Sequence, residues 1–126
     1  MARPTANLTT IFVYGTLMRG ECRHSVLRGQ QFVSVASTEP RYRLLLVDDY
    51  PGLVDAANGK GVSIVGELWQ VDRQNLQRLD AIECVDDGLF KRQKIQLTEP
   101  SGWADAWFYL QDATNLENLG SDWRLR

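Results

Sequence analysis

The chain has 126 residues, enough for one domain, and its shares of hydrophobic (44%) and charged (24%) residues are ordinary for a soluble globular protein. A net charge of −2 with scattered Lys and Arg residues excludes a basic surface for nucleic acid or an anionic membrane. The sequence shows no apolar run long enough for a membrane helix, no signal-peptide pattern and only two cysteines. We therefore expect a cytoplasmic, monomeric single domain over residues 1–126, with a flexible N-terminus over 1–9.

The first expected element is a buried strand that runs through Ile11-Phe12-Val13 into Tyr14-Gly15-Thr16-Leu17. An unbroken apolar run rich in β-branched and aromatic residues is typical of a buried strand. Gly15 favours a turn at the strand's end because it lacks a Cβ. We expect the backbone N–H groups of the loop that follows to be free to bind a ligand.

The middle of the chain predicts strands joined by short turns. A short helix is expected over 21–28, strands over 31–36 and 42–47, and a turn over 48–52. Asn58-Gly59 is the strongest hairpin signal, and it predicts that a short strand beginning at Leu53 pairs with a strand over 62–71.

The second half predicts one clear helix and one clear hairpin. Asp72 is expected to cap a helix that runs through Leu76 to Glu83. Strands over 90–98 and 103–110 should pair across the turn Glu99-Pro100-Ser101-Gly102, and a weak helix is expected from Asp112 onward. Many strands with one or two helices indicate an α+β domain that closes as a small mixed β-barrel.

Glu83 is the most informative single residue because it lies on the apolar side of its helix. Leu76, Leu79 and Ile82 form one stripe, and Glu83, seven positions after Leu76, lies about 20° from it. Asp80 lies toward the edge of the stripe. Burial of a carboxylate raises its pKa, which suits a general acid/base working near neutral pH.

Structural explanations compete with these functional ones. Glu83 lies near the helix end, where it could be solvated or could pair with Arg92 or Lys91. Tyr14 and Tyr109 lie in expected strands, where most aromatic side chains belong to the core.

Other chemistries find little support. Cys22 and His24 are two residues apart, but no third group that would orient them is evident. One His and two distant Cys residues offer no metal-ligand spacing, and no phosphate-binding or dinucleotide-binding glycine pattern occurs. We therefore expect no metal and no cofactor.

Several segments, taken together in their order, resemble the gamma-glutamylcyclotransferase-like family, and its gamma-glutamylamine cyclotransferase branch in particular. The segments are Phe12-Val13-Tyr14-Gly15-Thr16-Leu17, Tyr50-Pro51-Gly52-Leu53-Val54, Val65-Gly66-Glu67-Leu68-Trp69, Leu79-Asp80-Ala81-Ile82-Glu83, Phe90-Lys91-Arg92 and Ala106-Trp107-Phe108-Tyr109. The resemblance implies an α+β fold with a mixed β-barrel of about five to seven strands, one main helix and short additional helices.

The resemblance also implies a site. Tyr14, Gly15, Thr16 and Leu17 would hold the glutamyl group, Glu83 would be the catalytic acid/base, and Tyr109 would line the same cavity. The sequence departs from the family where Cys84 replaces a common Gly and Phe90 replaces a common Tyr.

The expected reaction needs no nucleophile from the protein. The α-amine of a gamma-glutamyl amine or amide would attack the γ-carbonyl, which releases 5-oxoproline and a free amine. Two alternatives stay open: a non-catalytic small-ligand binding or regulatory module with the same pocket, and a hydrolase that releases glutamate.

Overall fold

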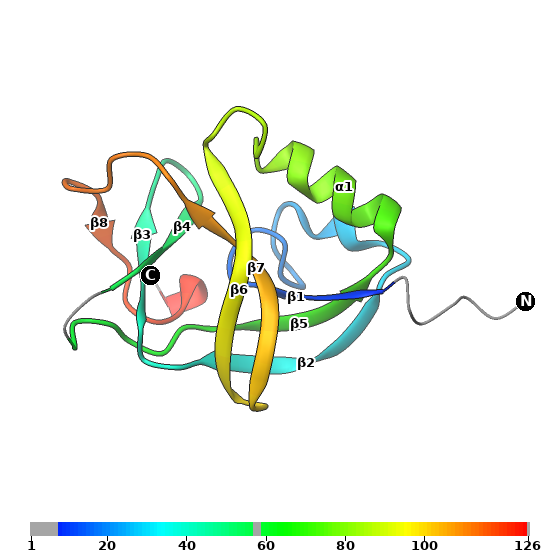
Figure 1. The fold of residues 1–126 in the computed structure, drawn as a ribbon, viewed down its shortest axis with the longest axis horizontal. Helices are drawn as coiled ribbons and strands as arrows, with labels where there is room; N and C mark the ends of the chain where they lie inside the picture. The colour runs from blue at the N-terminus through cyan, green and yellow to red at the C-terminus, as the bar shows by residue number, and fades with distance from the viewer. Residues whose placement is uncertain (1–7, 57–58, 126) are drawn as a thin grey trace, which may run out of the picture.

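A closed five-stranded barrel forms the centre of the molecule, and a three-stranded extension lies at one end (Figure 1). The computed structural model describes residues 8–56 and 59–125. The sheet order is β1-β5-β2-β6-β7-β4-β3-β8, and a further pairing of β1 with β7 closes the barrel. The strands are β1 Thr9–Val13, β2 Gln31–Thr38, β3 Tyr42–Leu46, β4 Pro51–Asp55, β5 Val65–Val71, β6 Phe90–Glu99, β7 Gly102–Tyr109 and β8 Glu117–Asn118. The predicted α+β fold with a mixed β-barrel is confirmed.

The barrel is mixed because β1 runs parallel to β7 and antiparallel to β5. β1 carries three consecutive buried residues, Ile11, Phe12 and Val13, as expected for a strand enclosed on both faces. The apolar run read from the sequence is thus the strand at which the barrel closes.

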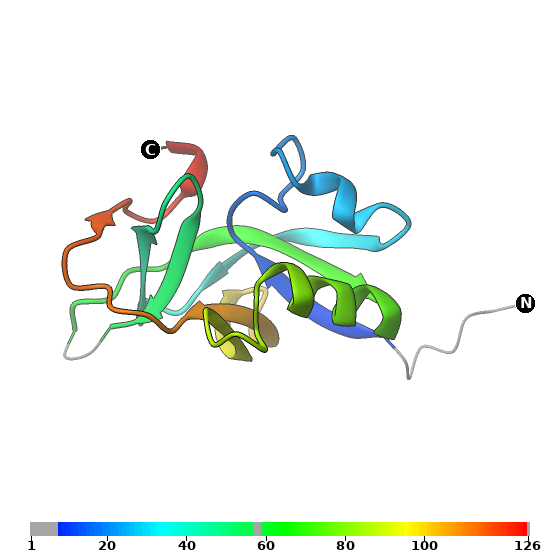
Figure 2. The same cartoon turned by 90° about the horizontal axis from the view of Figure 1, so that it is seen from above.

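One α-helix, α1 (Arg73–Ile82), lies alongside the barrel near β1, and two 3₁₀ helices are short: η2 (His24–Leu27) and η3 (Trp123–Leu125) (Figure 2). Asp72 caps α1 as predicted, because its carboxylate accepts a hydrogen bond from the Asn75 N–H at 2.8 Å. Leu79 is fully buried, and the Asn75 amide donates to the Val26 carbonyl, which joins α1 to η2. Among the described residues, no helix is long and apolar enough to cross a membrane.

Most predicted elements are present, with small changes at their ends. The strand expected over 31–36 continues through Thr38, whose hydroxyl accepts the Ile64 N–H at 2.9 Å. The short helix expected over 21–28 is the four-residue η2. The hairpin of β6 and β7 is confirmed along its whole length.

The hairpin predicted at Asn58-Gly59 is wrong, although Asn58 itself lies outside the described residues. β4 pairs with β3 and β7, and β5 pairs with β1 and β2. Residues 47–50 instead join β3 to β4 as the actual hairpin, and Pro51 and Gly52, which were expected in the turn over 48–52, are the first residues of β4. A local turn signal does not determine which neighbour the next strand finds, because barrel pairing is a long-range choice.

The weak helix predicted from Asp112 is also wrong. This segment carries a turn at Asp112, whose carboxylate accepts the Thr114 N–H, and then the short strand β8, which pairs with the outer edge of β3. Two apolar residues are too few to hold a helix on the core, whereas the open backbone edge of β3 offers hydrogen bonds.

Candidate active site

The loop that follows β1 is held by its own backbone hydrogen bonds. The Met18 N–H donates to the Gly15 carbonyl at 3.1 Å, and the Arg23 N–H donates to the Thr16 carbonyl at 2.8 Å. Within residues 8–56 and 59–125, the N–H groups of Gly15, Thr16 and Leu17 donate to no protein acceptor. Three neighbouring free donors on a curved backbone are suited to an anionic or carbonyl oxygen.

A pocket opens where this loop meets the start of β4 and the C-terminal end of α1. Besides the last residues of β1, it is lined by the loop Tyr14–Leu17 together with Arg23, Tyr50, Pro51, Glu83 and Trp107. A Cβ on Gly15 would come within 2.9 Å of the Pro51 Cδ, so the loop and β4 approach each other as closely as a glycine allows. The four predicted residues of the β1 loop and Glu83 therefore line one pocket.

Glu83 reaches the pocket because it occupies the C-cap of α1. Its N–H still donates to the Leu79 carbonyl at 2.9 Å, as in the helix. Burial raises the pKa of the Glu83 carboxyl from 4.5 to about 7, although the positive charge of Arg23 acts against this rise. A carboxyl group with a pKa near 7 can both accept and donate a proton at neutral pH.

Glu83 is not paired with either of the two cations suggested by the sequence. Arg92 pairs with Asp80 and Asp105, each at 3.2 Å, and no ion pair joins Glu83 to Arg92 or Lys91 in the described part of the chain. Asp80 also accepts the indole N–H of Trp107 at 2.8 Å, so it holds a wall of the pocket.

Tyr14 is both a core residue and a pocket residue. It is 8% exposed, and its hydroxyl donates to the Trp107 carbonyl at 2.7 Å. Burial, together with the charge of Glu83, raises the Tyr14 pKa well above 10. Its phenol is therefore a neutral, fixed wall at physiological pH.

Tyr109 is not among the side chains that line this pocket. Its ring packs against Phe90, with centroids 5.5 Å apart, and Phe90 in turn lies beside Tyr50. Tyr109 also contributes to a raised Tyr50 pKa, whose largest cause is burial. Tyr109 thus supports the aromatic side of the pocket, and its contact with substrate stays a prediction.

Arg23, Tyr50 and Trp107 also line the pocket and were not among the predicted site residues. The Arg23 guanidinium lies 5.7 Å from the centroid of the Tyr50 ring, and both groups reach the same pocket. In the sequence, Tyr50 lies in an expected turn and in one of the segments that carry the family resemblance, whereas Arg23 lies in a segment without periodicity. A cation shortly after a ligand-binding loop is the one signal that could have identified Arg23.

Cys22 and His24, which the sequence offered as a possible nucleophile and base, do not form such a pair. Nδ1 of His24 donates to the Leu17 carbonyl at 3.0 Å, and Cys22 is exposed. Among the described residues, no group of three or more His, Cys, Asp or Glu side chains could hold a metal ion.

Comparison with known proteins agrees with this fold. The family model described as gamma-glutamyl cyclotransferase, AIG2-like, matches residues 11–125. A Vibrio cholerae protein named as a candidate gamma-glutamylcyclotransferase is 34% identical over 116 residues, covering 90% of this chain and 93% of its own. Gamma-glutamylaminecyclotransferase A of Danio rerio is 34% identical over 103 residues, covering 76% and 63%. The crystal structure of an AIG2-like protein from Mus musculus superposes with a TM-score of 0.74 at 27% identity, covering 91% and 88%.

The family model and the curated relatives identify a cyclotransferase enzyme. The chain belongs to the gamma-glutamyl cyclotransferase, AIG2-like, family.

Proposed function

We propose that the chain cyclises a gamma-glutamyl amine or amide and releases 5-oxoproline and a free amine. The observation that carries this proposal is the position of Glu83, a carboxyl group with a pKa of about 7 in the same pocket as the free N–H groups of Gly15, Thr16 and Leu17. An acid/base and an oxygen-binding backbone in one pocket are what this reaction requires.

In the proposed reaction, the free α-amine of the substrate is the nucleophile. Glu83 takes a proton from the α-ammonium, the amine attacks the γ-carbonyl, and Glu83 gives this proton to the leaving nitrogen as the amide C–N bond breaks. The attacking nitrogen loses a second proton as the lactam forms, and the released amine takes it up and leaves as an ammonium. The loop N–H groups bind the α-carboxylate or stabilise the developing oxyanion, and Arg23 adds positive charge beside them. Holding the substrate folded for attack supplies up to about 7–11 kcal/mol, and general acid/base help adds about 10²–10⁴-fold.

The reaction as proposed uses no metal or cofactor, and its substrate is a small molecule. We propose that the protein acts as a cytoplasmic monomer, and size-exclusion chromatography with light scattering tests the monomeric state directly. The identity of the leaving amine is to be read from a panel of gamma-glutamyl amines, with 5-oxoproline and free glutamate measured separately.

The decisive variant is Glu83→Gln, which is nearly isosteric but cannot transfer a proton. We expect kcat to fall by about 10²-fold or more, whereas 5-oxoproline still binds because the loop is unchanged. Asp80→Asn is the matched control, since the new amide group keeps an oxygen for the Trp107 indole, and we expect a smaller effect on kcat.

Near wild-type turnover by a folded Glu83→Gln protein would overturn the assignment of the acid/base. Binding of 5-oxoproline by the wild type without turnover of any gamma-glutamyl compound would identify a binding module instead. Release of glutamate in place of 5-oxoproline would identify a hydrolase.

A further inference from the structure

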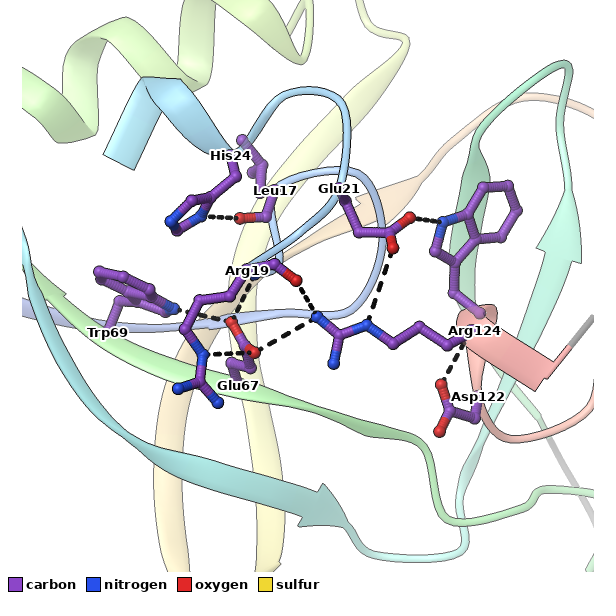
Figure 3. Close-up of polar contacts among 9 residues, drawn as sticks. Leu17, Arg19, Glu21, His24, Glu67, Trp69, Asp122 and Arg124 are labelled. Carbon is purple, nitrogen blue, oxygen red and sulfur yellow. Dashed lines mark hydrogen bonds and ion pairs between the residues drawn. The ribbon is translucent and has the colours of Figure 1, made fainter. Parts of the chain in front are cut away.

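A buried carboxylate, Glu67, lies beside Arg19, in the segment that follows the loop Tyr14–Leu17 (Figure 3). It projects from β5 and is 1% exposed. One oxygen accepts the backbone N–H of Arg19 at 3.0 Å and the Trp69 indole N–H at 3.2 Å, and the other accepts the Arg19 Nε at 3.0 Å. Glu67, a side chain of the barrel wall, therefore binds the backbone two residues after the loop Tyr14–Leu17.

Arg124, in the C-terminal segment, binds the same stretch of backbone at Arg19 (Figure 3). Its Nη2 donates to the Arg19 carbonyl and lies 3.5 Å from the second Glu67 oxygen, and its Nε lies 3.7 Å from the Glu21 carboxylate. Trp123 donates its indole N–H to Glu21 at 2.9 Å. The C-terminal segment is thus joined to the loop that follows the first strand.

The network fixes one short piece of backbone from both sides. Arg19 has its N–H bound by Glu67 and its carbonyl bound by Arg124, and His24 binds the Leu17 carbonyl. None of these contacts uses the N–H groups of Gly15 to Leu17, which donate to no acceptor in the described part of the chain. The contacts fix the loop and leave its ligand-binding donors unused.

Burial of a charge in a barrel wall is costly, and an apolar residue at the same position is often at least as stabilising. Burial alone raises the Glu67 pKa, but the hydrogen bonds from Arg19 and Trp69 and the charge of Arg19 outweigh it, so the pKa lies below its usual value. Glu67 therefore stays charged at pH values where Glu83 titrates. The position of Glu67 is better explained by its hydrogen bond to the Arg19 backbone than by a contribution to the stability of the fold.

We propose that Glu67 and Arg124 are positioning residues, which hold the loop Tyr14–Leu17 in the geometry that receives the glutamyl group. The proposal rests on the function proposed above for this loop. Neither residue lines the pocket, so both act through the Arg19 peptide. Preorganisation of a binding loop lowers the cost of ordering it when the ligand arrives.

The test compares Glu67→Gln and Arg124→Ala with wild type. We expect KM for a gamma-glutamyl amine and Kd for 5-oxoproline to rise about tenfold in both, equivalent to about 1.4 kcal/mol. We expect kcat to change by less than about twofold and the pH midpoint of turnover to stay the same, because Glu83 is untouched. Arg124→Lys keeps the charge and should recover part of the affinity.

Hydrogen exchange supplies a readout that needs no substrate. We expect faster exchange in both variants of the Met18, Glu21 and Arg23 amides, which are hydrogen-bonded within this segment, and unchanged exchange in β6. Asp105→Asn is the matched control, because it also breaks ion pairs of the barrel wall, with Arg92 and Lys94, without contacting the loop.

Wild-type affinity and wild-type loop exchange in both variants would overturn the proposal, as would an equal loss of affinity in Asp105→Asn. A fall in kcat with unchanged KM would also overturn it. If Glu67→Gln fails to fold, Arg124→Ala, whose side chain is 40% exposed in the wild type, decides the question. If the wild type neither binds 5-oxoproline nor turns over substrate, the proposed function is wrong. The hydrogen-exchange rates then still test whether Glu67 and Arg124 hold the loop.

Discussion

At the scale of single residues, the pocket depends on a carboxyl group whose environment differs sharply from water. Glu83 lies where burial raises its pKa, and the positive charge of Arg23 limits this rise. The result is a group balanced between its two protonation states at neutral pH. The same burial that makes Glu83 useful for proton transfer makes its charged form costly.

This cost predicts how stability depends on pH. The Glu83 pKa is about 7 in the folded protein against 4.5 for an unperturbed glutamate. Between these values the folded chain keeps a proton that the unfolded chain releases, so Glu83 weakens folding as pH rises through this window. We expect the Glu83→Gln variant to gain about 1–3 kcal/mol relative to wild type between pH 5 and pH 8.

Urea unfolding of both proteins at the two pH values measures this difference, and all other titrating groups cancel in the comparison. If the two proteins differ in unfolding free energy by the same amount at pH 5 and at pH 8, folding does not raise the Glu83 pKa.

At the scale of secondary structure, the end of α1 is the element that places Glu83. The Cys84 N–H donates to the Ala81 carbonyl, and the Val85 N–H donates to the Asp80 carbonyl, each at 3.1 Å. This pair of bonds is the Schellman motif, which usually has glycine where Cys84 lies. Cys84 instead adopts a φ of 54°, a left-handed conformation that disfavours a Cβ.

Cys84→Gly should therefore relieve backbone strain at the helix end. We expect the free energy of unfolding to rise by up to about 1 kcal/mol, since the relief is partly offset by the greater entropy of glycine in the unfolded chain. Cys84→Ala keeps the Cβ and should show no such gain. Urea unfolding midpoints decide, and a less stable glycine variant would show that the Cys84 side chain contributes more than the strain costs.

At the scale of the whole molecule, barrel closure brings the parts of the pocket together. β1 carries the loop and lies between β5 and β7, and β4 carries Pro51 against that loop. α1 contributes to the pocket through its C-cap residue, Glu83. The site therefore needs the closed barrel, because no single hairpin contains it.

Gly66→Ala tests the close pairing of β1 and β5, on which the closed barrel depends. A Cβ on Gly66 would come within 2.6 Å of the Phe12 ring and would also meet the Val13 carbonyl, where β5 pairs with β1. We expect a loss of at least about 2 kcal/mol of unfolding free energy, because backbone cannot move aside as a flexible side chain can. Urea unfolding measures it, and an unchanged midpoint would contradict the close pairing of β1 and β5.

The sequence by itself determined the elements whose signals are local. The apolar run before Gly15 predicted β1 and its loop, and Asp72 with the spacing of Leu79 and Glu83 predicted α1 and its carboxylate. These predictions succeeded because strand pleating, capping and helical periodicity act over a few neighbouring residues.

Only the tertiary structure decided the strand order and the partners around the pocket. β5 pairs with β1 and β2 despite the turn signal at Gly59, and Glu67 meets Arg124 from the far end of the chain. Nothing local in the sequence marks Glu67 as buried, because its charge is acceptable there only once Arg19 and Arg124 arrive from distant segments. Contacts of this kind depend on how the barrel closes, and closure is a property of the whole chain.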